Sequence, residues 1–419
     1  MNLLLLCEFL SLALSVGEHP IYFVSGFGGS PLFGTVLYDK LYPQCANITH
    51  QQYFPAVDEE FYVNQSECQS LFMTVRLENG KVKTLPGIEV ETLPFGEWNF
   101  GWEFSLNDDH KFTGVSFNFM NHFLTSEPIY EQLKANIDNQ TEKVVLIGYS
   151  QGTHFLIDFL QRFVNDANWT QEHIDGVVLL APAVGGFLNL QRQIDQTMDP
   201  FISNDQMKVA IQRMPGLHNL LPNYHVYNDT ALIENYTNGT TVKASQIYQF
   251  LRENDRLDND AYEIFKLTEK DHLQNDYLEE LGVRTLVLYN SGFPTIGAYR
   301  WNNTIDDMIP INRPGDGEVT ADGAQYLCRN WINFTTCVDF HKENAFTHKS
   351  IVHEKDVIER IIQFIELTEE KVEIGGLGIF IVVIAIAALQ AVVLIVVLFI
   401  LCKNRGNDVP TVGSFVSFG

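Results

Sequence analysis

The stretch VVLIGYSQGTHFLIDFL, Val144 to Leu160, indicates how this chain folds. Its first four residues are a short apolar run of the kind found in a buried strand, and Thr153–Leu160 has the apolar character of a buried helix. The residues between them, G-Y-S-Q-G (148–152), fit G-x-S-x-G, a tight strand-to-helix turn called a nucleophile elbow. The turn needs glycines because the strand and helix backbones approach too closely for side chains. We therefore predict that Ser150 is a nucleophile at the end of a buried strand.

The composition excludes some classes of function. The chain has 419 residues, of which 46% are hydrophobic, and this is enough for one large domain with insertions or for two domains. Its formal net charge is −25 and its sequence pI is about 4.7. Nucleic-acid binding usually needs a basic face, so these values argue against a nucleic-acid partner.

Both ends of the chain carry apolar segments. Residues 1–17 have the length and apolar character of a signal peptide. Gly375–Cys402 lacks charged residues and is long enough to cross a bilayer as one helix. Basic residues at the start of the tail (403–419) place that tail in the cytosol by the positive-inside rule. We expect a single-pass type I protein whose domain, residues 18–370, is lumenal or extracellular, in the secretory pathway, at the cell surface or in a lysosome.

Glycosylation signals and cysteines agree with that topology. N-x-[ST] sequons occur only before the predicted membrane helix, at Asn47, Asn64, Asn139, Asn168, Asn228, Asn235, Asn238, Asn302 and Asn333. Two of the six cysteines fall in the end segments, and the other four suggest two disulfides in an oxidising compartment. We favour Cys45–Cys68 and Cys328–Cys337 among the three possible pairings, since each closes a short local loop.

Further strands and insertions surround the elbow. Ile21–Leu32 predicts a strand that ends in a glycine-rich turn, and Gly176–Gly186 and Arg284–Gly292 predict two more buried strands. Strands that alternate with helices indicate an α/β fold with a mostly parallel central sheet. Residues 33–75, with Cys45 and Cys68, are interpreted as a disulfide-pinned loop excursion. Residues 187–283 are polar and helical in pattern, which is typical of an inserted cap.

A serine nucleophile needs a base to take its proton and an acid to orient that base. With this elbow, the acid and then the histidine follow the serine along the chain. Asp316 lies between two glycines, and Asp322, Asp306 and Asp307 are alternatives. His348 and His353 both precede an amphipathic helix. His154 directly follows the elbow and is interpreted as structural, and His341 has no obvious acid partner.

The same residues resemble those of the lecithin:cholesterol acyltransferase family. VSGFGGSPL is similar to the family's oxyanion loop with Ser25 in place of proline, and LIGYSQG is similar to its elbow with Tyr149 in place of histidine. GDGEVTADGAQYLCRNW and HKSIVHEKDVIERI resemble its acid and histidine segments. The family's P-Y-D-W-R block is represented only by SFNFMN (116–121). The second disulfide also departs from the family, because Cys337 lies downstream of Cys328 where the family's partner cysteine lies upstream.

The resemblance implies an α/β-hydrolase fold and a catalytic set of Ser150, Asp316 and His348. Phe27 and Gln151 would supply the backbone N–H groups of the oxyanion hole. The resemblance also implies that residues 33–75 form a lid, which Cys45–Cys68 would pin. It also implies that a phospholipid acyl chain is moved to a lipid alcohol or to water through an acyl-serine. We expect no metal and no cofactor. The alternative is a catalytically inactive surface glycoprotein with an adhesion or binding role, and the intact catalytic set argues against it.

Overall fold

The computed structural model of the chain describes residues 19–54, 65–97, 112–121, 125–186, 188–197, 204–269, 278–302, 304–342 and 346–366. These residues belong to one compact unit, Met1–Glu366. The predicted signal peptide and the predicted membrane helix lie outside them. Among the described residues, no helix has both the length and the apolar character that a membrane span requires.

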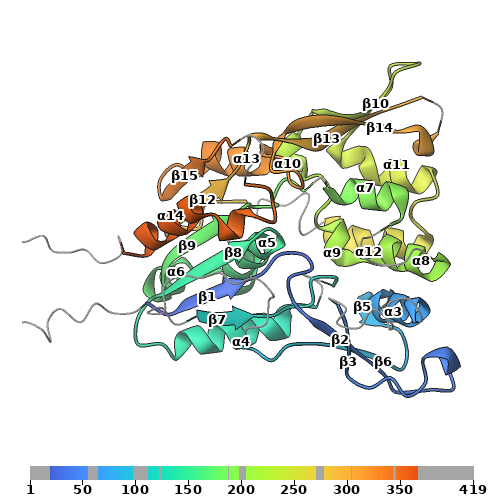
Figure 1. Cartoon of the computed structure of the whole chain (residues 1–419), viewed down its shortest axis with the longest axis horizontal. Coiled ribbons are helices and arrows are strands. Elements are labelled where there is room, and N and C mark those ends of the chain that lie inside the picture. The colour runs from blue at the N-terminus through green and yellow to red at the C-terminus, as the bar shows by residue number, and fades with distance from the viewer. Residues whose placement is uncertain are drawn as a thin grey trace, which may run out of the picture. The chain divides into compact units, whose positions relative to one another are not determined.

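A six-stranded sheet in the order β15-β12-β9-β8-β1-β7 forms the centre of the unit (Figure 1). Every neighbouring pair of these strands is parallel, which confirms the α/β fold with a parallel central sheet. In chain order the strands are β1 (Ile21–Val24), β7 (Phe112–Val115), β8 (Val144–Tyr149), β9 (Ile174–Leu180), β12 (Arg284–Tyr289) and β15 (Thr335–Asp339).

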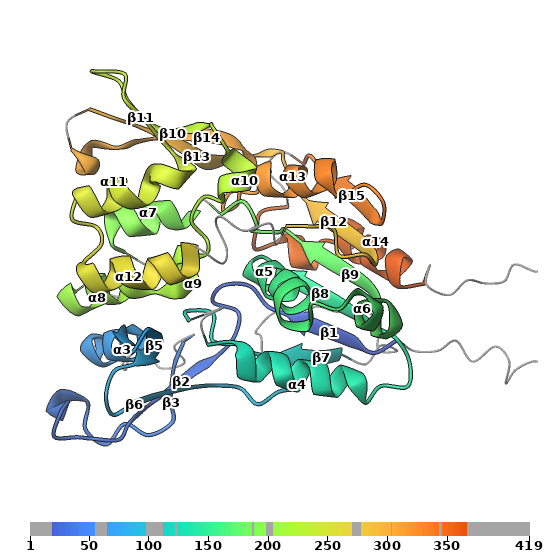
Figure 2. The ribbon, with the colours of Figure 1, turned by 180° about the vertical axis from the view of Figure 1, so that it is seen from behind.

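Alternate strand residues enter two apolar cores, because successive side chains of a strand point to opposite faces. Val144 and Leu146 join the larger core, and Val145 and Ile147 join the other one. The larger core includes residues of helices α4 (Glu127–Asp138), α5 (Gln151–Asp158) and α13 (Asp322–Asn330). The other core is covered by α14 (Lys355–Glu366), which buries Val357, Ile361, Phe364 and Ile365 along one stripe. Helices therefore cover both faces, as Figure 2 shows from behind.

Shorter elements complete this layer. A π-helical turn (Phe159–Val164) continues α5, and α6 (Ala167–His173) leads into β9. A 3-10 turn, Ile351–His353, precedes α14.

The region predicted to be a loop excursion contains regular structure. Strands β2 (Leu32–Val36), β3 (Gln51–Phe54) and β6 (Ile88–Thr92) form an antiparallel sheet, and α3 (Ser66–Met73) and the hairpin β4 (Val75–Glu78) and β5 (Lys81–Thr84) lie between β3 and β6 in the chain. These strands have only four or five residues each, so their periodicity is hard to see in the sequence. The predicted Cys45–Cys68 disulfide is confirmed, and it joins a 3-10 turn (Pro43–Cys45) to α3.

The cap region is helical, as predicted, with its own apolar core. Its helices are α7 (Leu188–Asp195), α8 (Asp205–Arg213), α9 (Pro215–His218), α10 (Tyr224–Tyr227), α11 (Ile247–Glu253), which a 3-10 turn (Ala244–Gln246) precedes, and α12 (Asn259–Thr268).

The cap also contains a sheet that the sequence did not indicate. Strand β10 (Ala231–Asn235) pairs with β11 (Thr241–Lys243) on one side and with β13 (Phe293–Trp301) on the other. Strand β13 follows β12 in the chain and forms a hairpin with β14 (Ile309–Gly315), with a 3-10 turn (Ile305–Asp307) between them. The cap is therefore completed by residues beyond the predicted boundary at 283.

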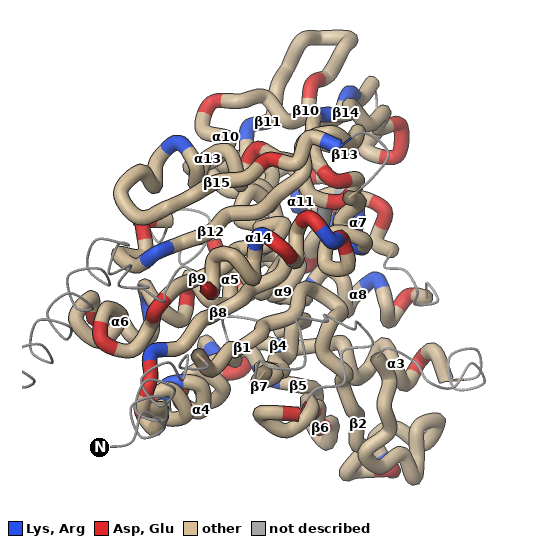
Figure 3. Tube along the Cα trace, turned by 60° about the vertical axis from the view of Figure 1, so that its left-hand side comes forward, with Lys and Arg blue, Asp and Glu red and all other residues tan. Residues whose placement is uncertain are grey.

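Charged residues are spread over the unit. From the side shown in Figure 3, Lys and Arg are interspersed with Asp and Glu along the described chain and form no single basic face.

Candidate active site

Ser150 lies at the junction of β8 and α5, where the predicted elbow is present. Its backbone has φ 54° and ψ −118°, a conformation that is uncommon for a residue with a side chain. A Cβ atom on Gly152 would lie 2.2 Å from the Val24 carbonyl oxygen, and one on Gly148 would lie 2.7 Å from the Gly152 carbonyl oxygen. Both positions therefore require glycine, for the reason inferred from the sequence.

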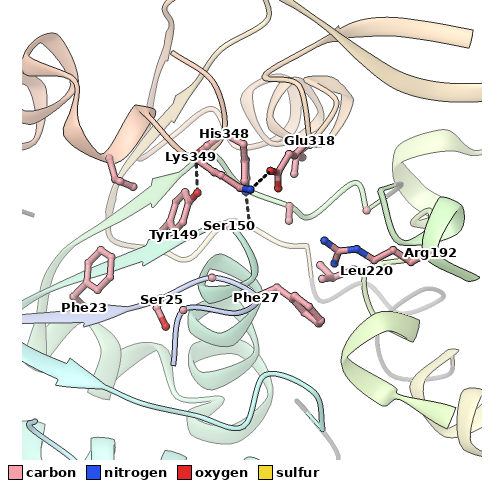
Figure 4. Close-up of a pocket in the computed structure, with 16 residues that line it drawn as sticks. Phe23, Ser25, Phe27, Tyr149, Ser150, Arg192, Leu220, Glu318, His348 and Lys349 are labelled. Atoms are coloured by element: carbon pink, nitrogen blue, oxygen red, sulfur yellow. Dashed lines mark hydrogen bonds and ion pairs between the residues drawn. The ribbon is translucent and has the colours of Figure 1, made fainter. Parts of the chain in front are cut away.

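His348 and Asp316 complete a hydrogen-bonded chain with this serine. His348 Nε2 lies 2.8 Å from Ser150 Oγ (Figure 4). On the other side of the ring, His348 Nδ1 lies 2.7 Å from Asp316 Oδ2. The other carboxylate oxygen, Asp316 Oδ1, accepts the N–H groups of Glu318 (3.0 Å) and Val319 (2.7 Å), which fixes the orientation of the carboxylate. All three residues of the chain are buried. The structure thus brings together the three residues that the sequence selected.

The charge environment of His348 favours its protonated form. Burial by itself lowers the pKa of the imidazole, but the charge and hydrogen bond of Asp316 and the charge of Glu318 outweigh burial. Lys349 opposes them weakly, and the pKa of His348 is raised above its usual value of 6.5. A base with a raised pKa accepts the serine proton readily, provided that the solution pH keeps it neutral beforehand.

The backbone of the predicted oxyanion loop lies beside the serine. Residues 26–29 form a tight turn in which the Gly29 N–H donates to the Gly26 carbonyl at 3.0 Å, with Gly28 at φ 79°. A Cβ atom on Gly26 would lie 2.7 Å from the Ser150 Cβ, so glycine is needed for this approach. Phe27 follows Gly26 in the turn, and Gln151 follows Ser150 as the first residue of α5. The two expected oxyanion residues therefore flank the serine.

A pocket of about 840 Å³, part of it open to solvent, surrounds the Ser150 hydroxyl. Its apolar lining includes Phe23, Phe27, Tyr149, Leu220, Val319 and Val352. Charged groups are Arg192, whose guanidinium lies 5.1 Å from the Phe27 ring centre, and the ion pair Lys349–Glu318 at 3.5 Å. An apolar pocket with few charges suits an acyl chain that carries a polar headgroup.

The alternative residues lie in other surroundings. Asp322 pairs with Arg313 at 3.3 Å, Asp306 pairs with Arg256, and Asp307 accepts a hydrogen bond from Thr304 at 3.0 Å. His353 is exposed in the turn before α14. None of these four residues lines the pocket.

The two remaining histidines are also separate from the pocket. His154 is buried, and burial lowers its pKa to about 4 although a hydrogen bond from the imidazole to the Ala183 backbone opposes the shift, which agrees with a structural role. His341 is bonded through Nδ1 to Ser291 Oγ at 2.9 Å, and that hydroxyl also donates to Asp339 at 2.6 Å. The Ser291 hydroxyl therefore connects the His341 ring to the carboxylate of Asp339, an acid partner that the sequence did not reveal.

Tyr149 is a site residue that the sequence reasoning missed. Its hydroxyl donates to the His348 carbonyl oxygen at 2.6 Å, and its ring stacks on the imidazole with ring centres 5.2 Å apart. Burial, with the charges of Asp316 and Glu318, raises the pKa of Tyr149 well above its usual value, so it remains a hydrogen-bond donor. The available signal was its place in the elbow, where the family has histidine. Glu318 and Lys349, next to the predicted acid and base, were also missed.

Neither disulfide lines the pocket, and none of the sequon asparagines that the structure describes does so. Cys328–Cys337 is present as predicted and joins α13 to β15. The sequon asparagines Asn47, Asn139, Asn168, Asn228, Asn238 and Asn333 are exposed, and Asn302 is half-buried. Asn64 lies outside the described residues. Asn235 is only 5% exposed and its Nδ2, the atom that would carry a glycan, donates to the Asn302 carbonyl at 3.0 Å, so the folded structure disfavours glycosylation there.

Part of the chain matches a known protein family. Residues 106–286 match the model of the lecithin:cholesterol acyltransferase family. The family resemblance read from the motifs is thereby confirmed. The matched segment contains Ser150 and ends before Asp316 and His348, so the placement of those two residues rests on the geometry described above. No curated protein matches the chain.

Solved structures give only distant likenesses. The mature form of lipase BlEst2 from Bacillus licheniformis is 11% identical, with 84% of this chain and 93% of that chain covered and a TM-score of 0.34. A membrane phospholipase A described as a bacterial virulence factor is 10% identical, with 85% and 81% covered and a TM-score of 0.35. Neither likeness carries weight at these scores.

Proposed function

We propose that this protein is a serine lipid acyltransferase or phospholipase A that moves an acyl chain from a phospholipid to a lipid alcohol or to water. The observation that carries the proposal is the continuous hydrogen-bonded chain from Ser150 Oγ through His348 to Asp316, inside a mostly apolar pocket. The match to the lecithin:cholesterol acyltransferase family supports the lipid substrate class.

The geometry supports the following mechanism. His348 Nε2 takes the Ser150 proton as Oγ attacks the ester carbonyl carbon, and Asp316 stabilises the imidazolium. The Phe27 and Gln151 N–H groups hold the negative oxygen of the tetrahedral intermediate. His348 then protonates the leaving lysophospholipid oxygen, and Ser150 retains the acyl chain as an ester. A lipid alcohol or water attacks this acyl-serine with His348 again as base, which frees Ser150.

A fluorophosphonate probe tests the chemistry, because only an activated serine reacts with it efficiently. We expect labelling of the wild-type protein at Ser150 and no labelling of Ser150→Ala. If the wild-type protein is not labelled and cleaves no ester, the inactive adhesion glycoprotein becomes the better interpretation.

Product analysis separates the two forms of the proposal. Phospholipid labelled in its acyl chain is supplied with and without a lipid alcohol, and the products are separated. Transfer predicts a new lipid ester that depends on the alcohol, whereas a plain phospholipase releases free fatty acid in both cases.

We further propose a single-pass type I topology, with residues 18–370 lumenal or extracellular. Support comes from the uncharged segment 375–402, the basic residues after it and the distribution of sequons. Protease added to sealed vesicles with the cytosolic side outward should leave the Ser150 region intact. Digestion of that region would refute the topology without affecting the proposed chemistry.

A further inference from the structure

The side chain of Gln151 extends away from the pocket into a buried junction. Its Nε2 lies 3.3 Å from the Phe119 carbonyl oxygen, 3.2 Å from the Gly216 carbonyl oxygen and 3.3 Å from Asn219 Oδ1. Gln151 and Phe119 are completely buried, and Asn219 is 1% exposed. One amide group therefore links the first turn of α5 to residues 116–121 and to the cap helix α9.

The same junction supports the other oxyanion residue. The Phe119 ring meets the Phe27 ring edge-on, with ring centres 4.7 Å apart, and also packs against Phe54 at 5.1 Å. Phe119 thus contacts both residues whose backbone N–H groups face the reacting carbonyl in the proposed mechanism. It comes from SFNFMN (116–121), the segment that stands where the family has P-Y-D-W-R.

The cap is seated on this segment by its backbone. The Gly216 N–H donates to the Met120 carbonyl at 2.6 Å, and a Cβ atom on Gly216 would lie 1.9 Å from the Phe119 carbonyl oxygen. Any shift of α9 would therefore change the acceptors that surround Gln151 Nε2. Gln151 adjoins Ser150 in the chain, and its backbone N–H is one of the two that the proposed mechanism assigns to the oxyanion hole.

We propose that Gln151 is a positioning residue whose side chain couples the seating of the cap to the geometry of the oxyanion hole. The inference deepens the proposed function and rests on it. An apolar residue at this position would leave three buried acceptors without their shared donor, and buried polar groups left unpaired are costly. The geometry thus gives glutamine a role in α5 beyond filling space.

Gln151→Met tests the proposal with little change in side-chain volume. Gln193→Met is the matched control, because Gln193 is also completely buried and its Nε2 donates to the Ile211 carbonyl at 2.9 Å within the cap. Loss of an oxyanion donor costs about 10²–10³ in kcat, so a displaced donor should cost about 10-fold to 100-fold. KM for a soluble ester should stay within about twofold, since ground-state binding is retained.

The specific readout is the affinity for a trifluoromethyl ketone, whose hydrated or serine-bound form mimics the tetrahedral intermediate. In Gln151→Met this affinity should fall by about the same factor as kcat, because both depend on the oxyanion hole. Gln193→Met should keep kcat and the inhibitor affinity within about twofold of wild type, even where its melting temperature falls as much as that of Gln151→Met.

Asn219→Ala keeps the proposal testable if Gln151→Met does not fold. It removes one of the three acceptors from the cap side, and we expect a smaller loss of kcat, about threefold to tenfold, with KM unchanged.

Equal kcat losses in Gln151→Met and Gln193→Met would overturn the inference. Wild-type inhibitor affinity in Gln151→Met and Asn219→Ala would also overturn it. Either result with an active wild-type enzyme leaves the proposed function intact, whereas an inactive wild-type enzyme would overturn both.

Discussion

The central sheet and the cap sheet each deliver part of the same hydrogen-bonded chain, by different means. Ser150 is placed by β8 and α5, which adjoin it in sequence, and His348 follows β15 of the same parallel sheet. Asp316 directly follows β14, a strand of the cap sheet. The position of Ser150 therefore depends on local chain geometry, whereas that of Asp316 depends on how the cap hairpin is seated. In the proposed mechanism, the cap sheet would thus take part in the chemistry.

The largest expected effect lies on the central-sheet side of this comparison. Ser150→Ala should lower ester turnover on the order of a millionfold, because it removes the nucleophile. The measurement is kcat on a soluble ester, with circular dichroism to show that the fold is retained. Activity above a tenth of wild type would contradict the assignment.

His348→Ala should be almost as damaging, because the serine proton then has no acceptor. His353→Ala is its control, since that residue is exposed and does not line the pocket. The control should keep most of its kcat. If His353→Ala were the more damaging variant, His353 and not His348 would be the base.

The lid disulfide should affect substrate access more than chemistry. Cys45→Ser with Cys68→Ser removes a bridge between residues 23 apart, which corresponds to about 3 kcal/mol of unfolding free energy. We expect a several-fold larger loss of activity on phospholipid vesicles than on a short soluble ester. The pair Cys328→Ser with Cys337→Ser is the control, and an equal loss on both substrates would indicate a general folding role for the lid bridge.

Thr295→Val tests the contribution of the cap sheet to the acid. Thr295 lies on β13, and its hydroxyl accepts the Gly317 N–H at 2.8 Å, one residue after Asp316. Losing this bond should cost about 1 kcal/mol and lower kcat about fivefold, with KM unchanged. Thr304→Val is the matched exposed control on the same hairpin. Unchanged kcat in Thr295→Val would show that the hairpin does not hold the acid in place.

The smallest expected effect is a change in pH dependence. The negative charge of Glu318 helps to raise the pKa of His348, and a raised pKa keeps the imidazole protonated, and thus inactive as a base, up to a higher pH. Glu318→Gln should therefore move the acid limb of the kcat/KM profile to lower pH. Glu359→Gln, on the exposed side of α14, should leave the limb in place. A shift to higher pH in Glu318→Gln would refute this account.

The sequence determined the parts of this protein that depend on neighbouring residues. The elbow around Ser150 was evident because one short stretch holds the strand, both glycines and the helix. The glycine-rich turn with Phe27 was evident for the same reason. Both disulfides were predicted correctly because each closes a short loop. Asp316 and His348 were selected through family motifs that are themselves short and contiguous.

Only the tertiary structure decided what depends on contacts between distant residues. The hairpin β13–β14 joins strands β10 and β11 across the cap, and no local periodicity shows which sheet a strand will enter. The hydrogen bond from Tyr149 to the His348 carbonyl joins residues 199 positions apart, and the donor of Gln151 reaches acceptors 32 to 68 positions away. The hydrogen bond from Asn235 Nδ2 to the Asn302 carbonyl likewise joins residues 67 positions apart, whereas the sequon at Asn235 is a local pattern. The sequence gives the chemical type of each side chain, but the packing of the fold decides which other groups that side chain contacts.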